Sequence, residues 1–131
     1  MLPCSKMRPT ACGASAGETI VLLVEADANA RDRHEVLLTS VGYSVLSVAA
    51  LPDAVEVQSS AIIIADITAF HWLQAQQFGH LRPILVIAED CTTGVTACLC
   101  GAIDWIPSYG EADYFLSTLA DTLQPPARRQ W

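Results

Sequence analysis

Four carboxylates stand at the ends of long apolar runs in this sequence. Glu25 follows TIVLLV, Asp66 follows AIIIA, and Glu89 and Asp90 follow PILVIA. A bare buried carboxylate is costly, so we expect these side chains to emerge at the edge of a core. Carboxylate oxygens at such an edge could hold a hard cation such as magnesium. An aspartate in the same place can also cap the turn that follows it, and both interpretations stay open.

The apolar runs alternate with helical stretches, which predicts an α/β fold. Short, nearly continuous apolar runs are typical of parallel strands that are buried on both faces. In such sheets, ligands bind beyond the carboxyl ends of the strands, so the four carboxylates line one crevice if their strands are neighbours. The expected strands are 19–26, 43–49, 61–66, 83–90 and 103–107, and the expected helical segments are 27–42, 51–60, part of 67–82, 91–102 and 111–123.

Local signals set the bounds of several helices. Asp27 is a suitable N-cap and Gly42 a suitable stop for the helix at 27–42. We expect at most a short helix between Asp66 and Pro83, because Gly79 and Pro83 both oppose a longer one. The apolar stripe expected along the helix at 27–42 consists of Ala30, Leu37, Leu38 and Val41, with His34 on the same stripe.

Length and composition indicate one globular domain between two tails. The 131 residues are 52% hydrophobic and 16% charged, and we expect a flexible tail at 1–17, a domain at 18–124 and a second tail at 125–131. A net charge of −7 argues against nucleic-acid binding. No apolar stretch is long enough for a membrane helix, the N-terminus lacks a signal-peptide core, and the five cysteines are odd in number. We therefore expect reduced thiols and a cytoplasmic location.

Four segments together resemble the receiver domain of two-component response regulators. They are IVLLVEADANARDRHEVLLTSVGYSV, IIIADI, RPILVIAED and GAIDWI, in family order and at near-family spacing. The resemblance covers about residues 18–124. It implies a flavodoxin-like (CheY-like), doubly wound, five-stranded parallel sheet of order 2-1-3-4-5. It also implies phosphorelay signalling without enzymatic activity, Asp66 as phosphoacceptor, and a protein partner, either a histidine kinase or a downstream regulator. A homodimer is compatible with it.

The chain departs from the family where the family's chemistry needs particular side chains. Ala26 stands where the resemblance implies a second metal-binding carboxylate, and Ala88 where it implies a hydroxyl. Ser108 replaces a lysine, and Tyr109 replaces the proline beside it. Phosphoryl transfer depends on positioning and on neutralisation of negative charge. The metal ligands that remain, Glu25 and Asp66, therefore predict only weak magnesium binding, with uncertain support from Glu89 or Asp90.

These departures lead us to interpret the chain as a degenerate, pseudo-receiver-like domain that acts by protein–protein interaction. Trp105 stands at the family's switch aromatic, and we expect it and Tyr109 to mark the interaction face. In the family, a hydroxyl at position 88 and a lysine at position 108 connect the phosphate to this face, and Ala88 and Ser108 cannot make these connections here. Gly94 lowers the stability of the neighbouring helix, which should make that helix easier to reshape. The alternative is a working phosphoprotein, phosphorylated on Asp66 by a histidine kinase.

Two other protein classes, one of phosphatases and one of cobalamin-binding domains, fit the sequence less well. Phosphatases of the haloacid dehalogenase type carry a second aspartate two residues after the nucleophile, where this chain has Thr68. The stretch DRHEVL resembles a cobalamin-binding motif, but Leu37 replaces its glycine and the motif lies within a helix. We therefore expect no enzymatic activity, and we expect His34 to be a packed residue of its helix.

Overall fold

A five-stranded parallel sheet forms the centre of the protein. The computed structural model describes residues 19–49, 53–77 and 82–123, and the two predicted tails lie outside these ranges. The strand order is β2-β1-β3-β4-β5, with every neighbouring pair parallel. The predicted flavodoxin-like topology is thus confirmed. The strands are β1 (Ile20–Val24), β2 (Ser44–Val48), β3 (Ile62–Asp66), β4 (Ile84–Ala88) and β5 (Asp104–Pro107).

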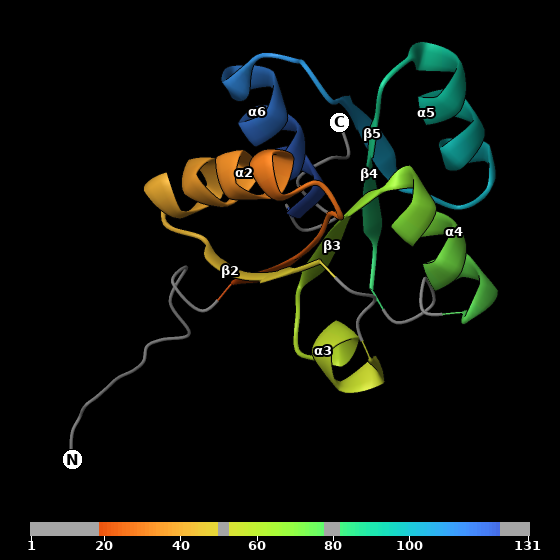
Figure 1. The fold of residues 1–131 in the computed structure, drawn as a ribbon, viewed down its shortest axis with the longest axis horizontal. Helices are drawn as coiled ribbons and strands as arrows, with labels where there is room; N and C mark the ends of the chain where they lie inside the picture. The colour runs from red at the N-terminus through yellow and green to blue at the C-terminus, as the bar shows by residue number, and fades with distance from the viewer. Residues whose placement is uncertain (1–18, 50–52, 78–81, 124–131) are drawn as a thin grey trace, which may run out of the picture.

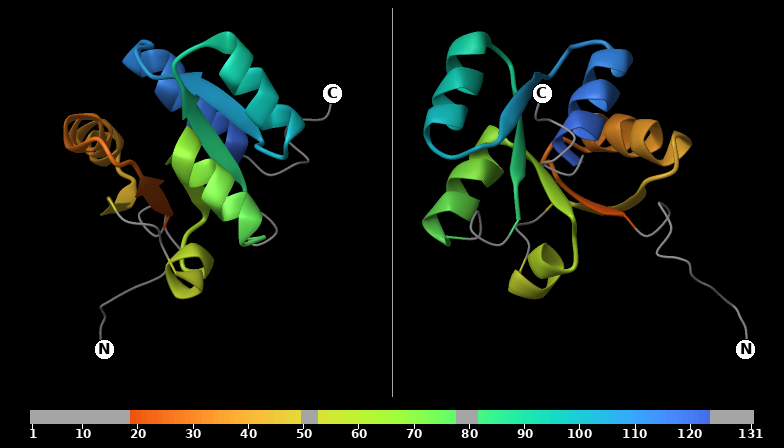
Figure 2. Two further views of the ribbon diagram at one scale, coloured as in Figure 1. Left: turned by 45° about the vertical axis from the view of Figure 1, so that its right-hand side comes forward. Right: turned by 180° about the vertical axis from the view of Figure 1, so that it is seen from behind.

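Helices cover both faces of this sheet (Figure 1). On one side lie α2 and α6, and on the other α3, α4 and α5, as the views in Figure 2 also show. In the described ranges, no helix has the length and apolar character needed to cross a membrane. The helices are α2 (Ala28–Ser40), α3 (Ala54–Gln58), α4 (Ile67–Ala75), α5 (Cys91–Leu99) and α6 (Ala112–Leu123).

The core consists of two apolar clusters, one on each face of the sheet. Within β3, Ile63 and Ala65 contribute to the cluster under α3, α4 and α5, whereas Ile62 and Ile64 contribute to the cluster under α2 and α6. All four side chains are fully buried. Burying one large aliphatic side chain stabilises a protein by about 1.5–3 kcal/mol. This two-sided burial explains why the strand sequences are continuously apolar.

The helix α2 begins and ends at the residues that the sequence indicated. Asp27 Oδ1 accepts hydrogen bonds from the backbone N–H groups of Asn29 (2.9 Å) and Ala30 (3.2 Å). Gly42 has φ +103°, a conformation that glycine adopts most easily. The prediction that Val41 belongs to the buried stripe was wrong. Val41 is 53% exposed, because it is the C-cap residue and its φ of −107° and ψ of 10° no longer follow the helix.

The connection after β3 holds one short helix, as predicted. The helix α4 has nine residues and ends at Ala75, where Gln76 is the C-cap. Gln77 then has φ +62°, which stops helical propagation. Gly79, which the sequence argument used, lies outside the described residues. Because α4 begins directly at the end of β3, Asp66 stands at the junction of strand and helix.

Candidate functional site

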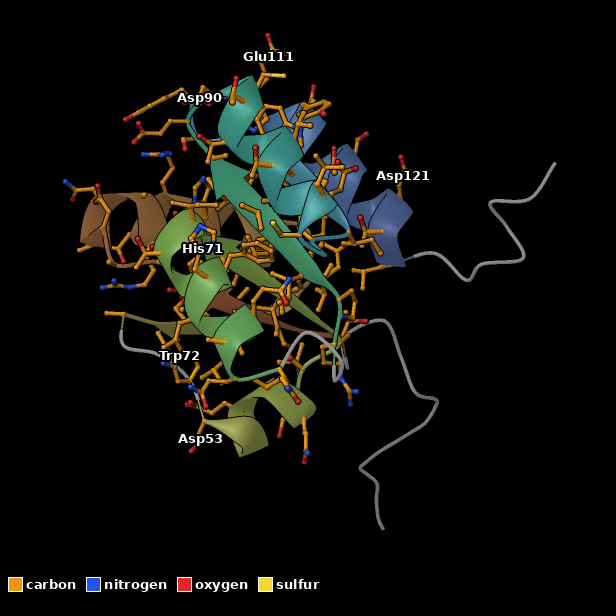
Figure 3. All side chains as sticks on the ribbon, turned by 90° about the vertical axis from the view of Figure 1, so that its right-hand side faces the viewer. Asp53, His71, Trp72, Asp90, Glu111 and Asp121 are labelled. Atoms are coloured by element: carbon orange, nitrogen blue, oxygen red, sulfur yellow. The ribbon has the colours of Figure 1, made fainter. Side chains whose placement is uncertain are left out.

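A cleft of about 500 Å³ lies beyond the carboxyl ends of β1, β3 and β4. These strands are neighbours in the sheet, since β3 pairs with both β1 and β4. The predicted gathering of strand-end carboxylates is therefore present. Figure 3 labels Asp90 toward this end of the molecule and Asp53 toward the opposite end. The cleft is lined by residues that include Glu25, Ala26, Asp27, Arg33, His34, Asp66, Thr68, Ala88, Glu89, Asp90, Ser108 and Tyr109.

Asp66 is partly buried at this cleft, and both of its carboxylate oxygens accept backbone hydrogen bonds. Oδ1 accepts from the N–H of Ala69 at 2.8 Å, which makes Asp66 the N-cap of α4. Oδ2 accepts from the N–H of Ala26 at 3.0 Å. Asp66 thus fits both interpretations of the sequence, because it lies at the cleft and also caps a helix. Its role as phosphoacceptor stays a prediction.

Glu25 makes a buried contact that the sequence argument did not anticipate. Its Oε1 lies 2.7 Å from Nδ1 of His34 on α2. Glu25 and His34 are each only 4% exposed. The imidazole ring also stacks on Phe115 of α6, with centroids 5.0 Å apart and an interplanar angle of 23°. His34 is packed, as expected, but it also binds the carboxylate that was predicted to hold a metal.

The sequence did contain a signal for this pair. His34 lies on the apolar stripe of the helix that follows the strand before Glu25, so the two side chains could have been expected to meet. The backbone oxygen of Glu25 is engaged as well, because Arg31 donates a 2.8 Å hydrogen bond to it from Nη1. Arg31 therefore braces the turn after β1 and leaves the carboxylate itself to His34.

The exposed carboxylates at the rim of the cleft serve mainly as helix caps. Asp90 Oδ1 accepts a 2.8 Å hydrogen bond from the N–H of Thr93 and caps α5. Hydrogen bonds from the backbone and the side chain of Thr93 hold the pKa of Asp90 below its ordinary value. Asp27 caps α2 in the same way, whereas Glu89 is exposed. Two of the rim carboxylates thus have structural tasks.

The side chains of the cleft do not fit the magnesium ion that the fold family implies. Such an ion demands near-octahedral oxygen ligands, and carboxylates that are already held in other contacts must reorient or use their remaining lone pairs to bind it. Glu25 is bound by His34, and each oxygen of Asp66 already accepts a backbone N–H. Across 19–49, 53–77 and 82–123, no group of three or more His, Cys, Asp and Glu side chains is arranged to hold a metal. The weak site predicted from Glu25 and Asp66 stays a prediction that these contacts oppose.

Arg33 is a cleft residue that the sequence argument missed. It is an exposed residue of α2, and its side chain borders the same cleft as Asp66. Of the lining residues that the structure describes, it alone carries a permanent positive charge. Its position six residues after the N-cap Asp27 was the available signal, because that spacing keeps it within the first two turns of a helix that starts at the cleft.

The opposite wall of the cleft lacks the groups whose loss the sequence indicated. Ala88 is buried, and its carbonyl oxygen accepts a 2.9 Å hydrogen bond from the N–H of Ser108. Ser108 is partly buried and lines the cleft. Tyr109 also lines it but is 86% exposed. This wall therefore presents a methyl group and a neutral hydroxyl where the resemblance implies a hydroxyl and a cation.

Trp105 is half-buried on β5 and packs closely against α5. A Cβ atom placed on Gly94 would overlap the six-membered ring of Trp105. Gly94 is itself buried within α5. The glycine thus has a packing role, because it lets the indole ring approach the helix backbone. This contact argues against the expectation that Gly94 makes the helix easy to reshape, since any change in α5 must also displace Trp105.

Comparisons with solved structures identify the fold. No protein-family model matches the chain, and no curated protein sequence is significantly similar to it. The chemotaxis response regulator CheY4 of Vibrio cholerae is similar, at 22% sequence identity and a TM-score of 0.61. The alignment covers 80% of this chain and 98% of the CheY4 chain. A response regulator receiver protein from Burkholderia phymatum matches 82% with 98% of its own, at 21% identity and a TM-score of 0.68.

A putative pilus assembly-related protein from Burkholderia pseudomallei K96243 is also similar. It matches 83% of this chain with 92% of its own, at 15% identity and a TM-score of 0.70. The identities in all three comparisons are low, so the likeness is one of fold. The chain has the fold of response regulator receiver domains, which confirms the fold that the four sequence segments implied.

Proposed function

We propose that this chain is a non-enzymatic, pseudo-receiver module of two-component signalling that acts by binding a protein partner, without phosphorylation of Asp66. One observation carries the proposal. Both oxygens of Asp66 accept backbone hydrogen bonds, so its carboxylate serves to hold α4 and the turn after β1. Each oxygen keeps a second lone pair, but the two hydrogen bonds fix the orientation of the carboxylate and lower its nucleophilicity, which disfavours attack on phosphorus.

The electrostatics of the cleft support the same conclusion. A phosphoryl group on Asp66 would add negative charge beside Glu89 and Asp90, with Arg33 as the nearby cation. Position 108 offers a serine and position 88 an alanine, so neither supplies charge. Removing one preorganised electrostatic partner of a transition state typically costs about 2.7–4 kcal/mol. A cleft without the lysine and with at most weak magnesium binding should therefore accept phosphate very slowly.

The interaction surface that we propose lies on α5, β5 and α6. Its apolar side chains include Leu99, which is 83% exposed, together with the exposed Val95, Ile103 and Tyr114. Aromatic residues are favoured anchors at protein-binding surfaces, which fits Trp105 on β5 and Tyr114 on α6. Because Trp105 is fixed against Gly94, this surface should keep one dominant shape. The partner is then selected by that shape.

Phosphate-analogue binding tests the proposal directly. Beryllofluoride with magnesium should leave the amide resonances of Ala26, Ala69 and Ser108 unchanged in NMR spectra, whereas a working receiver measured in the same buffer responds. Acetyl phosphate should leave the mass of the protein unchanged. Saturable shifts at these amides, or a phosphate found on Asp66, would contradict the proposal.

A signalling assay separates the two candidate faces of the molecule. In cells that depend on the protein, Trp105→Ala should reduce the signal, because it removes the aromatic anchor beside α5. Asp66→Asn keeps a capping oxygen and should leave the signal nearly unchanged. Loss of the signal in a folded Asp66→Asn variant would overturn the proposal.

One observation favours the alternative function, a receiver that a histidine kinase phosphorylates on Asp66. Arg33 lines the cleft, and its guanidinium could supply the positive charge that is missing at Ser108. The beryllofluoride experiment distinguishes the two functions, and Arg33→Gln would abolish the response in the second case only. The cytoplasmic location and the homodimer stay predictions under either function.

A further inference from the structure

The buried pair of Glu25 and His34 closes the inner side of the cleft. Nδ1 of His34 lies 2.7 Å from Oε1 of Glu25, and the two side chains are 5% exposed. Arg31 binds the backbone oxygen of Glu25 and leaves the carboxylate alone. One oxygen of the carboxylate, Oε1, is therefore engaged by a side chain of the protein's own α2 helix, at the place where the fold family implies a metal ion.

Asp66 is satisfied internally as well. The N–H of Ala26 donates to Oδ2 of Asp66, and Ala26 occupies the position of the missing carboxylate. A buried carboxylate must be paired or hydrogen-bonded to be tolerated. Here a histidine binds one oxygen of the buried Glu25, and backbone N–H groups bind both oxygens of the partly buried Asp66, so both acids have partners within the protein.

We propose that His34 is the positioning residue that keeps this cleft free of divalent metal. It holds Glu25 turned inward, and its imidazole takes the role that a metal ion would have beside that carboxylate. This inference rests on the proposed function, since a pseudo-receiver that is not phosphorylated has no need of the metal ion that phosphoryl transfer uses.

The stacking of His34 on Phe115 fixes the imidazole in that role. Phe115 is 3% exposed and belongs to the core cluster under α2 and α6. The ring of His34 is thus held on one side by an aromatic face and at Nδ1 by Glu25. A side chain constrained by two contacts has little freedom to turn away and release the carboxylate.

Magnesium titration of His34→Leu tests the proposal. Leucine keeps an apolar contact with Phe115 but cannot bind Glu25, so the freed carboxylate can turn toward the cleft. We expect calorimetry to give at least about a tenfold tighter magnesium affinity than in the unchanged protein, and manganese to bind likewise in electron paramagnetic resonance. His71→Leu, a change at an exposed histidine of α4, is the matched control and should have no effect.

Two further variants locate the new site. Glu25→Gln added to His34→Leu should remove the gain in affinity, because the amide is a weak magnesium ligand. Ala26→Asp added to His34→Leu should increase the gain, since it supplies a second carboxylate at the cleft. A folded His34→Leu variant with unchanged magnesium affinity would overturn the proposal, and so would tight magnesium binding by the unchanged protein.

A measurement on the unchanged protein covers the case in which His34→Leu does not fold. Long-range proton–nitrogen NMR spectra report the hydrogen bonding of the His34 ring. Millimolar magnesium should leave these signals unchanged, and any saturable change would refute the proposal. The outcome is separate from that of the beryllofluoride test. His34 could weaken magnesium binding even in a cleft that responds to beryllofluoride, and a cleft that does not respond could bind magnesium poorly for reasons that do not involve His34.

Discussion

Replacing Gly94 with alanine measures how firmly Trp105 is held. Gly94 is buried in the middle of α5, and a Cβ there would overlap Cδ2, Cε3 and Cε2 of the Trp105 ring. The atoms that it meets belong to a rigid aromatic ring and not to the end of a flexible chain. The indole must therefore leave its present position to admit one methyl group.

The expected magnitude follows from two opposing effects. Alanine is favoured over glycine in the interior of a helix by about 1 kcal/mol. Overpacking a well-packed site typically costs about 1–3 kcal/mol and occasionally more. Because the overlap at Gly94 involves three ring atoms, we place its cost at the upper end of that range. The net result should be a free energy of unfolding lowered by roughly 1–2 kcal/mol.

Urea unfolding and tryptophan fluorescence together provide the assay. Trp72 and Trp131 are first replaced by phenylalanine so that Trp105 is the sole tryptophan, which is excited selectively at the red edge of the absorption band. Gly94→Ala should lower the unfolding midpoint, shift the emission of the native state to longer wavelength and increase quenching by iodide. The matched control is Gly110→Ala, because a Cβ at Gly110 would come no closer than 3.4 Å to the nearest atoms of Pro107.

The refuting result is a gain instead of a loss. If Gly94→Ala raises the free energy of unfolding by about 1 kcal/mol and leaves the emission unchanged, the indole does not rest on α5. The interaction surface would then lack the rigidity that the proposed function assigns to it, and α5 would be the easily reshaped helix that the sequence suggested.

Two further predictions concern the ends and the surface of α5. Asp90→Ala should lower thermal stability at pH 7, because hydrogen bonds from Thr93 stabilise the ionised carboxylate. These bonds hold the pKa of Asp90 below its ordinary value of 3.8. A lowered pKa means that this stabilisation is present above pH 3.8 and is lost as the pH falls through the folded-state pKa. The difference in melting temperature between variant and parent should therefore shrink below about pH 4. Burial, and then the charge of Asp104, raise the pKa of Cys98, so it should react with iodoacetamide more slowly than the exposed Cys91 at neutral pH. Mass spectrometry of the digested protein measures both rates, and Asp104→Asn should speed the reaction of Cys98.

The sheet could be predicted because each strand is recognisable from its own sequence. Runs such as Ile62–Asp66 are apolar at every position that faces either core cluster, and this pattern needs no knowledge of distant residues. Boundaries were harder for α3, which spans Ala54–Gln58 and is shorter than the expected segment 51–60. Asp53 and Glu56 exchange backbone-to-side-chain hydrogen bonds of 3.0 and 2.9 Å, and this reciprocal cap sets the start of the helix. Residues 51 and 52 of the expected segment lie outside the described residues.

The site was less predictable, because its decisive contacts join different elements. The position of Asp66 followed from one strand, but its bond to Ala26 depends on the register of β3 beside β1. The partnership of Glu25 with His34 depends on the rotation of α2 over the sheet. Similarly, Gly94 was interpreted from helix propensity alone, and its contact with Trp105 appears only when β5 is placed beside α5.

The double task of Asp66 has a consequence for how such proteins are recognised and how they change over time. An aspartate that caps α4 and tethers the turn at Ala26 is worth keeping for folding alone. Selection for folding can therefore keep this aspartate in a chain that lacks the metal ligand, the lysine and the hydroxyl. A survey that counts every receiver-like chain with an aspartate at the end of its third strand would therefore overestimate how many of them carry phosphate. The state of the neighbouring positions, here Ala26, Ala88 and Ser108, is the better criterion.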